Sequence, residues 1–325
     1  MENRLYMSSS PHIRSDASTS KIMLDVLISL VPASVAGVYF FGLDAALMIV
    51  VCIVSCVAFE YLSRRFLFKR SNTISDLSAA VTGLLLALNL PPALPKWMAI
   101  VGSFFAIVVI KQLFGGIGQN FVNPALGARV FLLVAYGTKM TQWTMPRGFN
   151  EAVAITSATD ALTFATPLGA LKEGGELPGY LDMFLGNIGG SIGETSALAL
   201  IIGGIYLLIR KVITWEIPVI YIGTVAIMSW VLGPGGFLTG DPLYHVLAGG
   251  LMIGAIFMAT DYTTSPMTKK GVIIYAAGCG LLTVLFRMYT NMPEGVSYAI
   301  LLMNTAVPLI DRFTVPRPFG GDAHA

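Results

Sequence analysis

The sequence predicts an all-α integral membrane protein with about ten transmembrane helices. Hydrophobic residues make up 55% of the chain and charged residues only 12%, whereas a soluble domain contains about 25% charged residues. The apolar residues also come in blocks close to the length of about 20 residues that a helix needs to cross the hydrocarbon core. Backbone polar groups inside lipid must bond internally, so helices are the expected form of these blocks.

Ten apolar blocks qualify as spans, and they form two groups of five on either side of a long polar segment. The predicted spans are residues 22–41, 44–62, 77–90, 95–112, 123–136, 192–210, 214–233, 243–260, 270–288 and 295–310. The third, fifth and tenth are short and contain Gly or Pro. The chain therefore divides into an N-terminal segment 1–21, a first repeat 22–136, a loop 137–191, a second repeat 192–310 and a tail 311–325.

The two groups of spans resemble each other in their interruptions. Each has a polar break, at 89–95 and 260–266, and each has a turn with Gly or Pro before its last span, at 115–124 and 290–295. Five spans are an odd number, so the second group would be inverted relative to the first. Inverted repeats with interrupted helices are typical of transporters, whose sites lie near the repeat interface.

The distribution of basic residues predicts the orientation in the membrane. With the N-terminus inside, fourteen of the twenty Lys and Arg residues fall on the cytoplasmic side, five fall outside and Arg129 lies within the fifth span. Cytoplasmic loops carry the excess of positive charge. Both termini are therefore expected in the cytoplasm of a cell membrane, with the 137–191 loop on the outer face.

A threonine motif lies in the outer loop. Asp160 is followed by the hydroxyl of Thr163 and then by Ala-Thr166-Pro-Leu. This resembles the pattern Asp-Gly-x-Ser-Gly-Ala-Thr, in which the threonine of membrane subunits of ion-pumping redox complexes carries FMN through a phosphoester. Ala161 and Phe164 depart from it, since the pattern has Gly at both places. Thr166 matches the acceptor; the alternative is a Thr-rich loop without chemistry.

The turn 115–124 is the second informative motif. Three glycines within four residues allow close backbone approach, and Asn120 and Asn123 offer amide donors and acceptors three residues apart. An isoalloxazine ring has a carbonyl and imide edge that needs such partners, so both residues are candidates for a second flavin site. Alternatively, Asn123 caps the fifth helix, with Pro124 in its first turn.

Several charged and polar residues near span ends have two interpretations. Arg129 pairs with an acid such as Asp261 or Glu294, or it holds a phosphate or a flavin carbonyl, since charges within spans usually face the protein interior. The segment 186–196 supports an anion at a helix start, or it is a turn in which Ser191 or Thr195 caps the sixth helix. The remaining acids at span ends are expected to be caps or solvated groups: Asp25, Glu60, Asp76, Asp241 and Glu294.

No metal site is expected. Cys52, Cys56 and Cys279 lie inside predicted spans, and clusters usually need more thiolates at suitable spacing. We interpret the three cysteines as small apolar residues of the helix bundle.

Over nearly its full length the chain resembles the RnfD family of the Rnf electron-transport complex and, more distantly, the NqrB family of the sodium-translocating NADH:quinone oxidoreductase. The motifs that carry this resemblance are 165–168, 115–124, 193–196, 258–266 and 293–311. The resemblance implies covalent FMN on Thr166 and non-covalent riboflavin in the membrane part. It also implies a ferredoxin:NAD oxidoreductase complex that pumps Na⁺ or H⁺, with iron–sulfur subunits, a second flavin-carrying subunit and a flavin transferase as partners.

A small-solute channel or permease without a redox cofactor remains the alternative, because fold does not fix function. The chain has no dinucleotide fingerprint and no set of cluster-binding cysteines. It is therefore expected to be one subunit of a translocase and to need partners for the remaining chemistry.

Overall fold

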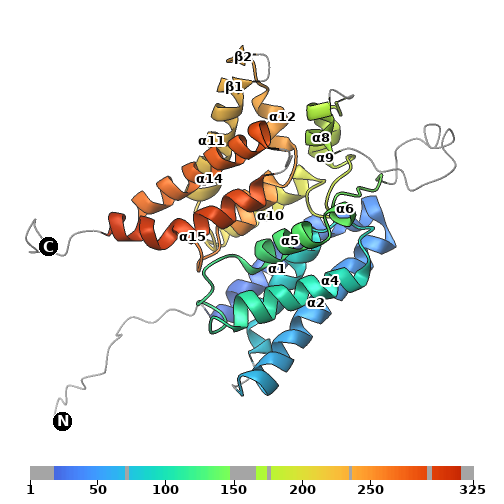
Figure 1. The fold of residues 1–325 in the computed structure, drawn as a ribbon, viewed down its shortest axis with the longest axis vertical. Helices are drawn as coiled ribbons and strands as arrows, with labels where there is room; N and C mark the ends of the chain where they lie inside the picture. The colour runs from blue at the N-terminus through green and yellow to red at the C-terminus, as the bar shows by residue number, and fades with distance from the viewer. Residues whose placement is uncertain are drawn as a thin grey trace, which may run out of the picture.

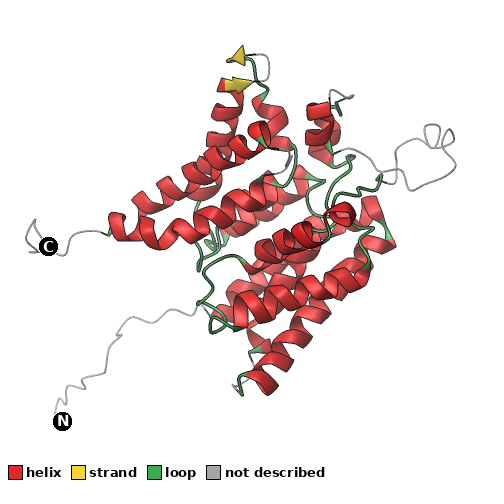
Figure 2. Cartoon of the chain, in the orientation of Figure 1, coloured by secondary structure: helices red, strands yellow, loops and turns green. Residues whose placement is uncertain are grey.

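The computed structural model describes residues 18–69, 73–146, 166–173, 177–233, 236–290 and 295–315. These residues are mostly helical, and helices lie within each of the predicted apolar blocks (Figure 2). Figure 1 shows the N-terminal helices, from blue to green, beside the C-terminal helices, from orange to red. The predictions that concern Asp160, Thr163 and Glu294 lie outside the described residues.

The first group of helices begins at Ser18, whose side chain accepts a hydrogen bond from the backbone N–H of Lys21 and so caps the first turn. The elements up to the outer segment are α1 (Thr19–Phe41), α2 (Leu43–Leu62), η1 (Ser63–Leu67), η2 (Ile74–Asp76), α3 (Ser78–Leu88), α4 (Lys96–Phe104), η3 (Phe105–Gln112), α5 (Pro124–Ala135) and α6 (Gly137–Met140). The helix α4 continues directly into the π-helix η3, so the predicted span 95–112 is helical almost throughout.

Two short helices, α8 (Pro167–Glu173) and α9 (Tyr180–Leu185), precede the second group, which begins with α10 (Ala197–Ile209). The elements that follow are α11 (Glu216–Val231), β1 (Leu232–Gly233), β2 (Gly236–Phe237), α12 (Pro242–Leu247), α13 (Leu251–Ile253), η4 (Gly254–Met258), α14 (Lys269–Tyr289) and α15 (Val296–Thr314). The two short strands pair antiparallel, Leu232 with Phe237. They extend from the end of α11 (Figures 1 and 2).

Three helical stretches among the described residues are long and apolar enough to cross a membrane: Thr19–Phe41, Leu43–Leu67 and Lys269–Tyr289. Large apolar side chains on their outer faces are exposed, among them Val35, Val54 and Ile273. Apolar residues on the surface of a long helix indicate a lipid-facing side. The protein is therefore a helical membrane protein.

Close helix packing is achieved through glycine. A Cβ atom on Gly203 of α10 would lie 2.1 Å from the carbonyl oxygen of Ser29 on α1. One on Gly83 of α3 would lie 2.7 Å from the carbonyl oxygen of Cys52 on α2. Small residues let helix backbones approach closely, which is the usual device where lipid removes the hydrophobic drive for association. The contact between α1 and α10 joins the two groups of helices.

Two predicted spans are shorter than the sequence indicates. The predicted span 192–210 begins as a helix only at Ala197, because residues 186–196 form a mostly buried loop whose backbone bonds to the end of α3. The predicted span 243–260 is interrupted at residues 248–250. Gly249 has φ of +68° there, a conformation that an L side chain rarely adopts.

Candidate functional site

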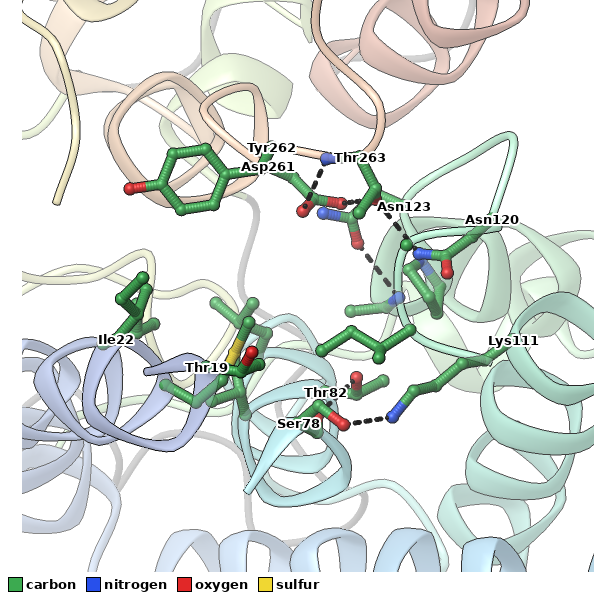
Figure 3. A pocket seen from close by; sticks show the side chains of 18 of the residues that line it. Thr19, Ile22, Ser78, Thr82, Lys111, Asn120, Asn123, Asp261, Tyr262 and Thr263 are labelled. Atoms are coloured by element: carbon green, nitrogen blue, oxygen red, sulfur yellow. Dashed lines mark hydrogen bonds between the residues drawn. The ribbon is translucent and has the colours of Figure 1, made fainter. Parts of the chain in front are cut away.

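A cavity of about 370 Å³ lies where the starts of α1, α3 and α5 meet the ends of η3 and η4. We call it the inner cavity (Figure 3). Its polar lining comes from Ser78, Thr82, Lys111, Asn120, Asn123, Asp261 and Thr263, together with Thr19. Apolar side chains such as Val81, Leu85 and Phe257 form the rest of the wall. Two of the π-helices in the described part of the chain, η3 and η4, lead into this cavity, and π-bulges are frequent at functional sites.

Asn123 lies at the inner cavity and caps α5. Its Oδ1 accepts hydrogen bonds from the N–H groups of Ala125 (3.1 Å) and Leu126 (3.3 Å). Its Nδ2 donates to the carbonyl oxygen of Met258 at 3.4 Å. The predicted helix cap is therefore confirmed, and most of the hydrogen-bonding capacity of Asn123 is used by the protein itself.

Asn120 differs from Asn123 in having an unused acceptor. Its Nδ2 donates to Thr263 Oγ1 at 3.3 Å. Its Oδ1 is buried and has no hydrogen-bond partner among the described residues. A buried polar atom without a partner is costly and is rare in folded proteins. The orphaned oxygen indicates a position where a ligand with an N–H group would be stabilised.

Lys111, which lines the inner cavity, belongs to a buried ion pair. Lys111 Nζ lies 2.7 Å from Glu60 Oε2 and also donates to Ser78 Oγ at 2.6 Å. Lys111 is 3% exposed and Glu60 is 1% exposed. The interpretation of Glu60 as a cap or a solvated group is thus wrong, because η3 and α2 pack so closely that its carboxylate is enclosed and neutralised by Lys111.

The other acids at helix ends have varied partners. Asp241 is the N-cap of α12, as predicted, since its carboxylate accepts from the N–H of Tyr244. Asp76 lies at the end of η2 and accepts from the N–H of Ser78, the first residue of α3. Asp25 instead pairs across helices with Arg210, at 3.2 Å, and accepts from the hydroxyl of Tyr206. Acids at helix ends thus serve either as helix caps or, in the case of Asp25, as one partner of an ion pair between helices.

Asp261 lies in the break after η4 and contributes to the inner cavity. Its carboxylate accepts from the hydroxyl groups of Thr263 (3.0 Å) and Thr264 (3.3 Å). Burial raises the pKa of this carboxyl group, and the hydrogen bonds from Thr263 and Thr264 oppose that rise. The cavity is therefore lined by a cation on one side and by a hydrogen-bonded acid on another.

Thr166 lies in a second, much smaller pocket at the opposite end of α3. The pocket has a volume of about 10 Å³ and is lined by residues that include Gly189, Gly190, Glu194 and Gly249. Thr166 is 7% exposed, and its Oγ1 accepts from the N–H of Gly169 at 3.1 Å, at the start of α8. Thr166 thus lies beside the 186–196 segment, for which one interpretation of the sequence is an anion support.

Arg129 belongs to a buried charged cluster near the Thr166 pocket. Its guanidinium lies 3.9 Å from Glu194 and donates to Asn89 Oδ1 (3.1 Å) and Ser297 Oγ (3.2 Å). The acids predicted from the sequence as its partners are Asp261 and Glu294. Among the described residues, the acid beside Arg129 is Glu194, because the loop 186–196 folds inward. Asp261 lies at the inner cavity instead, and Glu294 lies outside the described residues.

A second buried arginine supports the helix break at 248–250. Arg287 of α14 donates to the carbonyl oxygens of two residues beside this break, His245 and Ala248. Arg287 is 2% exposed. The guanidinium therefore satisfies carbonyl groups that would be bonded within the helix if α12 continued into α13.

The start of α10 also differs from the prediction. Ser196 caps this helix by accepting from the N–H of Ala199 at 3.3 Å, whereas the sequence indicates Ser191 or Thr195 for this role. The hydroxyl and N–H of Ser191 instead bond to the carboxylate of Glu194. Ser191 therefore helps to hold the acid that faces Arg129.

The two expected cofactors fit the structure unequally. The inner cavity is within the range of about 300–1,000 Å³ that small-molecule sites occupy, and the orphaned Asn120 Oδ1 suits the imide edge of a riboflavin. The Thr166 pocket holds about one water molecule. An isoalloxazine ring does not fit inside it, so an FMN joined to Thr166 would have its ring outside this pocket.

Sequence reasoning missed the roles of Lys111 and Glu194. The distribution of charge places Lys111 in a cytoplasmic loop, although this lysine ends an apolar block directly before a Gly-rich turn. A charge so close to a span usually faces the protein interior, and this was the signal that could have found it. Arg287 carries the same signal, since it lies at the end of the predicted span 270–288. Its partners could not be predicted, because the carbonyl groups that it contacts are exposed only by the break at 248–250.

No group of three or more His, Cys, Asp or Glu residues suited to a metal ion occurs in the described part of the chain. Cys52, Cys56 and Cys279 are free and buried.

These features define a helical membrane protein with a polar-lined cavity at one end of its bundle and a threonine pocket at the other. The chain belongs to the family described as NQR2, RnfD, RnfE, whose model matches residues 6–320. It is 50% identical over 323 residues to the D subunit of the Na⁺-translocating ferredoxin:NAD⁺ oxidoreductase complex of Acetobacterium woodii, and the match covers 98% of this chain and 96% of that protein.

Further relatives carry similar descriptions. The chain is 48% identical over 330 residues to the D subunit of the proton-translocating ferredoxin:NAD⁺ oxidoreductase complex of Clostridium ljungdahlii, covering 98% of this chain and 97% of that protein. It is 41% identical over 333 residues to the D subunit of the ion-translocating oxidoreductase complex of Stutzerimonas stutzeri, covering 94% of each chain.

Proposed function

We propose that this protein is the flavin-carrying membrane subunit of an ion-translocating ferredoxin:NAD⁺ oxidoreductase complex. The observation that carries the proposal is the match over nearly the whole chain to the D subunits of such complexes, two of them about half identical in sequence. Their descriptions differ in the ion, Na⁺ in one relative and protons in another. The proposal therefore covers translocation of Na⁺ or H⁺.

The first proposed cofactor is FMN on Thr166. A separate Mg²⁺-dependent transferase would use FAD, forming a bond between Thr166 Oγ1 and the FMN phosphorus. AMP would leave, and the hydroxyl proton would be lost. Support comes from the motif around Thr166 and from the glycines that line its small pocket. Thr166 must turn out of its bond with Gly169 to meet the transferase, because its hydroxyl is buried in the present conformation.

The second proposed cofactor is riboflavin in the inner cavity. Asn120 would accept a hydrogen bond from the ring, and Asn123 would keep the turn and the start of α5 in place. Flavins exchange one or two electrons, so they can link one-electron iron–sulfur partners to hydride chemistry elsewhere in a complex. What this chain supplies is a polar-lined site that orients the ring.

The proposed arrangement in the membrane has ten spans in two inverted repeats, with both termini in the cytoplasm and Thr166 on the outer face. Support comes from two short, buried helical stretches, α3 and α13–η4, one in each half. On this arrangement electrons pass between the inner cavity and the outer face. Moving one elementary charge against 100 mV requires about 2.3 kcal/mol, which redox steps of modest size supply.

The proposed partners are the other subunits of the complex, including a second flavin-carrying subunit and iron–sulfur subunits, together with the flavin transferase during maturation. The 12% of charged residues and the exposed apolar helix faces fit a protein surrounded by lipid and other membrane subunits. A channel or permease without flavin is the alternative function.

The test is flavin fluorescence of the denatured chain on a gel, after purification from cells that contain the transferase. The wild-type chain should fluoresce under ultraviolet light, and Thr166→Val should abolish the signal while the subunit still assembles. Thr163→Val serves as the matched control and should fluoresce like the wild type. A non-fluorescent wild-type chain would favour the permease, and fluorescence that persists in Thr166→Val would place the linkage elsewhere.

A further inference from the structure

The inner cavity is lined by a cation, Lys111, that has one hydrogen-bond donor without a partner among the described residues. A lysine ammonium has three N–H donors, and two of those of Lys111 are directed to Glu60 Oε2 at 2.7 Å and Ser78 Oγ at 2.6 Å. Lys111 and Ser78 line the cavity, whereas Glu60 lies behind its wall. Figure 3 shows the bond from Lys111 to Ser78 at the cavity. The third donor has no acceptor among the described residues and is available to a group inside the cavity.

The position of this ammonium is fixed by a network of part-buried hydrogen bonds. Glu60 Oε1 accepts from the hydroxyl of Thr73 at 2.8 Å, and Ser78 Oγ donates to Asp76 Oδ1 at 2.6 Å. Two carboxylates therefore hold the ammonium, one directly and one through Ser78. A buried ion pair contributes little net stability, because desolvating both charges is costly. Its presence at a cavity wall indicates a role in binding.

The unused groups of Lys111 and Asn120 are complementary. Lys111 offers a charged donor, and the buried Oδ1 of Asn120 is an acceptor without a partner among the described residues. A ring that carries a carbonyl beside an N–H, as the imide edge of a flavin does, satisfies both. Asn123 contributes less, since its amide already bonds to the protein backbone.

We propose that Lys111 makes the charged contact to a ring carbonyl of the flavin in the inner cavity, while Asn120 Oδ1 accepts from the neighbouring ring N–H. Glu60 and Ser78 are positioning residues that act through Lys111. The inference rests on the proposed presence of riboflavin in this cavity. It adds a consequence: reduction increases negative charge on the ring carbonyls, so the ammonium stabilises the reduced ring and raises its midpoint potential.

The first experiment uses the assembled complex, dialysed to equilibrium against riboflavin over a range of concentrations. Acid-extractable flavin reports binding in the cavity, since flavin joined to the chain is retained. The variant Lys111→Met combined with Glu60→Gln avoids leaving a buried carboxylate unpaired. It should bind riboflavin about 10-fold or more weakly, the loss expected for a hydrogen bond to a charged group, and the midpoint potential of the bound riboflavin should fall.

Lys269→Met is the matched control, because Lys269 is an exposed lysine at the start of α14. It should leave both affinity and midpoint potential at the wild-type values. Unchanged affinity and potential in the Lys111→Met, Glu60→Gln variant would overturn the inference. A wild-type complex that binds no riboflavin at all would instead overturn the proposed riboflavin site itself.

A second experiment needs no change to the charged pair. Sulfur accepts hydrogen bonds more weakly than oxygen, so one of 2-thioriboflavin and 4-thioriboflavin should bind the wild-type complex less tightly than riboflavin does. 3-Methylriboflavin, which lacks the ring N–H, should also bind the wild-type complex less tightly than riboflavin does. In the Asn120→Leu variant, the two compounds should bind with equal affinity. Equal affinity for riboflavin and both thio analogues would contradict the lysine contact, whether or not the charge-pair variant assembles.

Discussion

Asn120 and Asn123 lie three residues apart on one turn, but only Asn120 has a hydrogen-bond acceptor that no described residue uses. We expect Asn120→Leu to lower the amount of acid-extractable riboflavin in the complex, because it removes the unpaired Oδ1. The covalent flavin on Thr166 should stay. The measurement compares flavin released by acid with flavin retained on the chain. An unchanged released fraction in a folded variant would leave Asn120 as a residue of the turn only.

Asn123→Ala is expected to act mainly on stability. Its Oδ1 caps two backbone N–H groups of α5, and loss of such a cap costs about 0.5–2 kcal/mol. The variant should unfold at a lower temperature in detergent, followed by intrinsic fluorescence. Asn123→Asp, which keeps a capping oxygen, should recover most of the loss. Equal stability of Asn123→Ala and the wild type would show that the cap contributes little.

Arg129 is expected to be a structural residue of the buried cluster. Breaking a buried pair by removing one partner costs about 3–5 kcal/mol, because the other charge is left uncompensated. Arg129→Met should therefore destabilise the protein strongly in the same thermal assay. Adding Glu194→Gln removes the uncompensated charge and should restore part of the stability. If the double variant is no more stable than Arg129→Met, Glu194 is not the charge that Arg129 compensates.

At the scale of elements, the contact between α1 and α10 depends on the absence of a side chain at Gly203. A Cβ there would meet the carbonyl oxygen of Ser29 at 2.1 Å, so Gly203→Ala should separate the helices and lower the unfolding temperature. Gly223→Ala on α11 is the control, because nothing lies within 4 Å of a Cβ at Gly223 and alanine favours a helix. Similar thermal stability of the two variants would contradict close packing at Gly203.

For the whole molecule, the asymmetry of basic residues predicts the orientation. Gly175→Cys should react with an impermeant thiol reagent added to intact cells, with any outer membrane permeabilised, whereas Ser71→Cys should not. Background labelling from the native cysteines should be low, because Cys52, Cys56 and Cys279 are buried. The reverse labelling pattern would invert the topology and place Thr166 on the cytoplasmic face.

The class of fold and the places of most helices could be predicted from the order of residues along the chain. Apolar blocks near the length of a membrane span give helices because lipid offers the backbone no other partner. Local signals also sufficed for Asn123, since an asparagine before Pro124 caps a helix by contacts within three residues. That Asn120 and Asn123 lie on the same turn could be predicted for the same reason, because they are only three residues apart.

Contacts between residues that are far apart in the sequence depend on tertiary packing and could not be predicted from local patterns. Lys111 and Glu60 are 51 residues apart in sequence, and their pairing depends on how η3 packs beside α2. Glu194 reaches Arg129 because the loop 186–196 folds against the end of α3, and no local pattern encodes that approach. The break at 248–250 has the same origin: its carbonyl groups are stabilised by Arg287 of α14. Helices form from local hydrogen bonds, whereas a cavity and its buried charges depend on packing between elements.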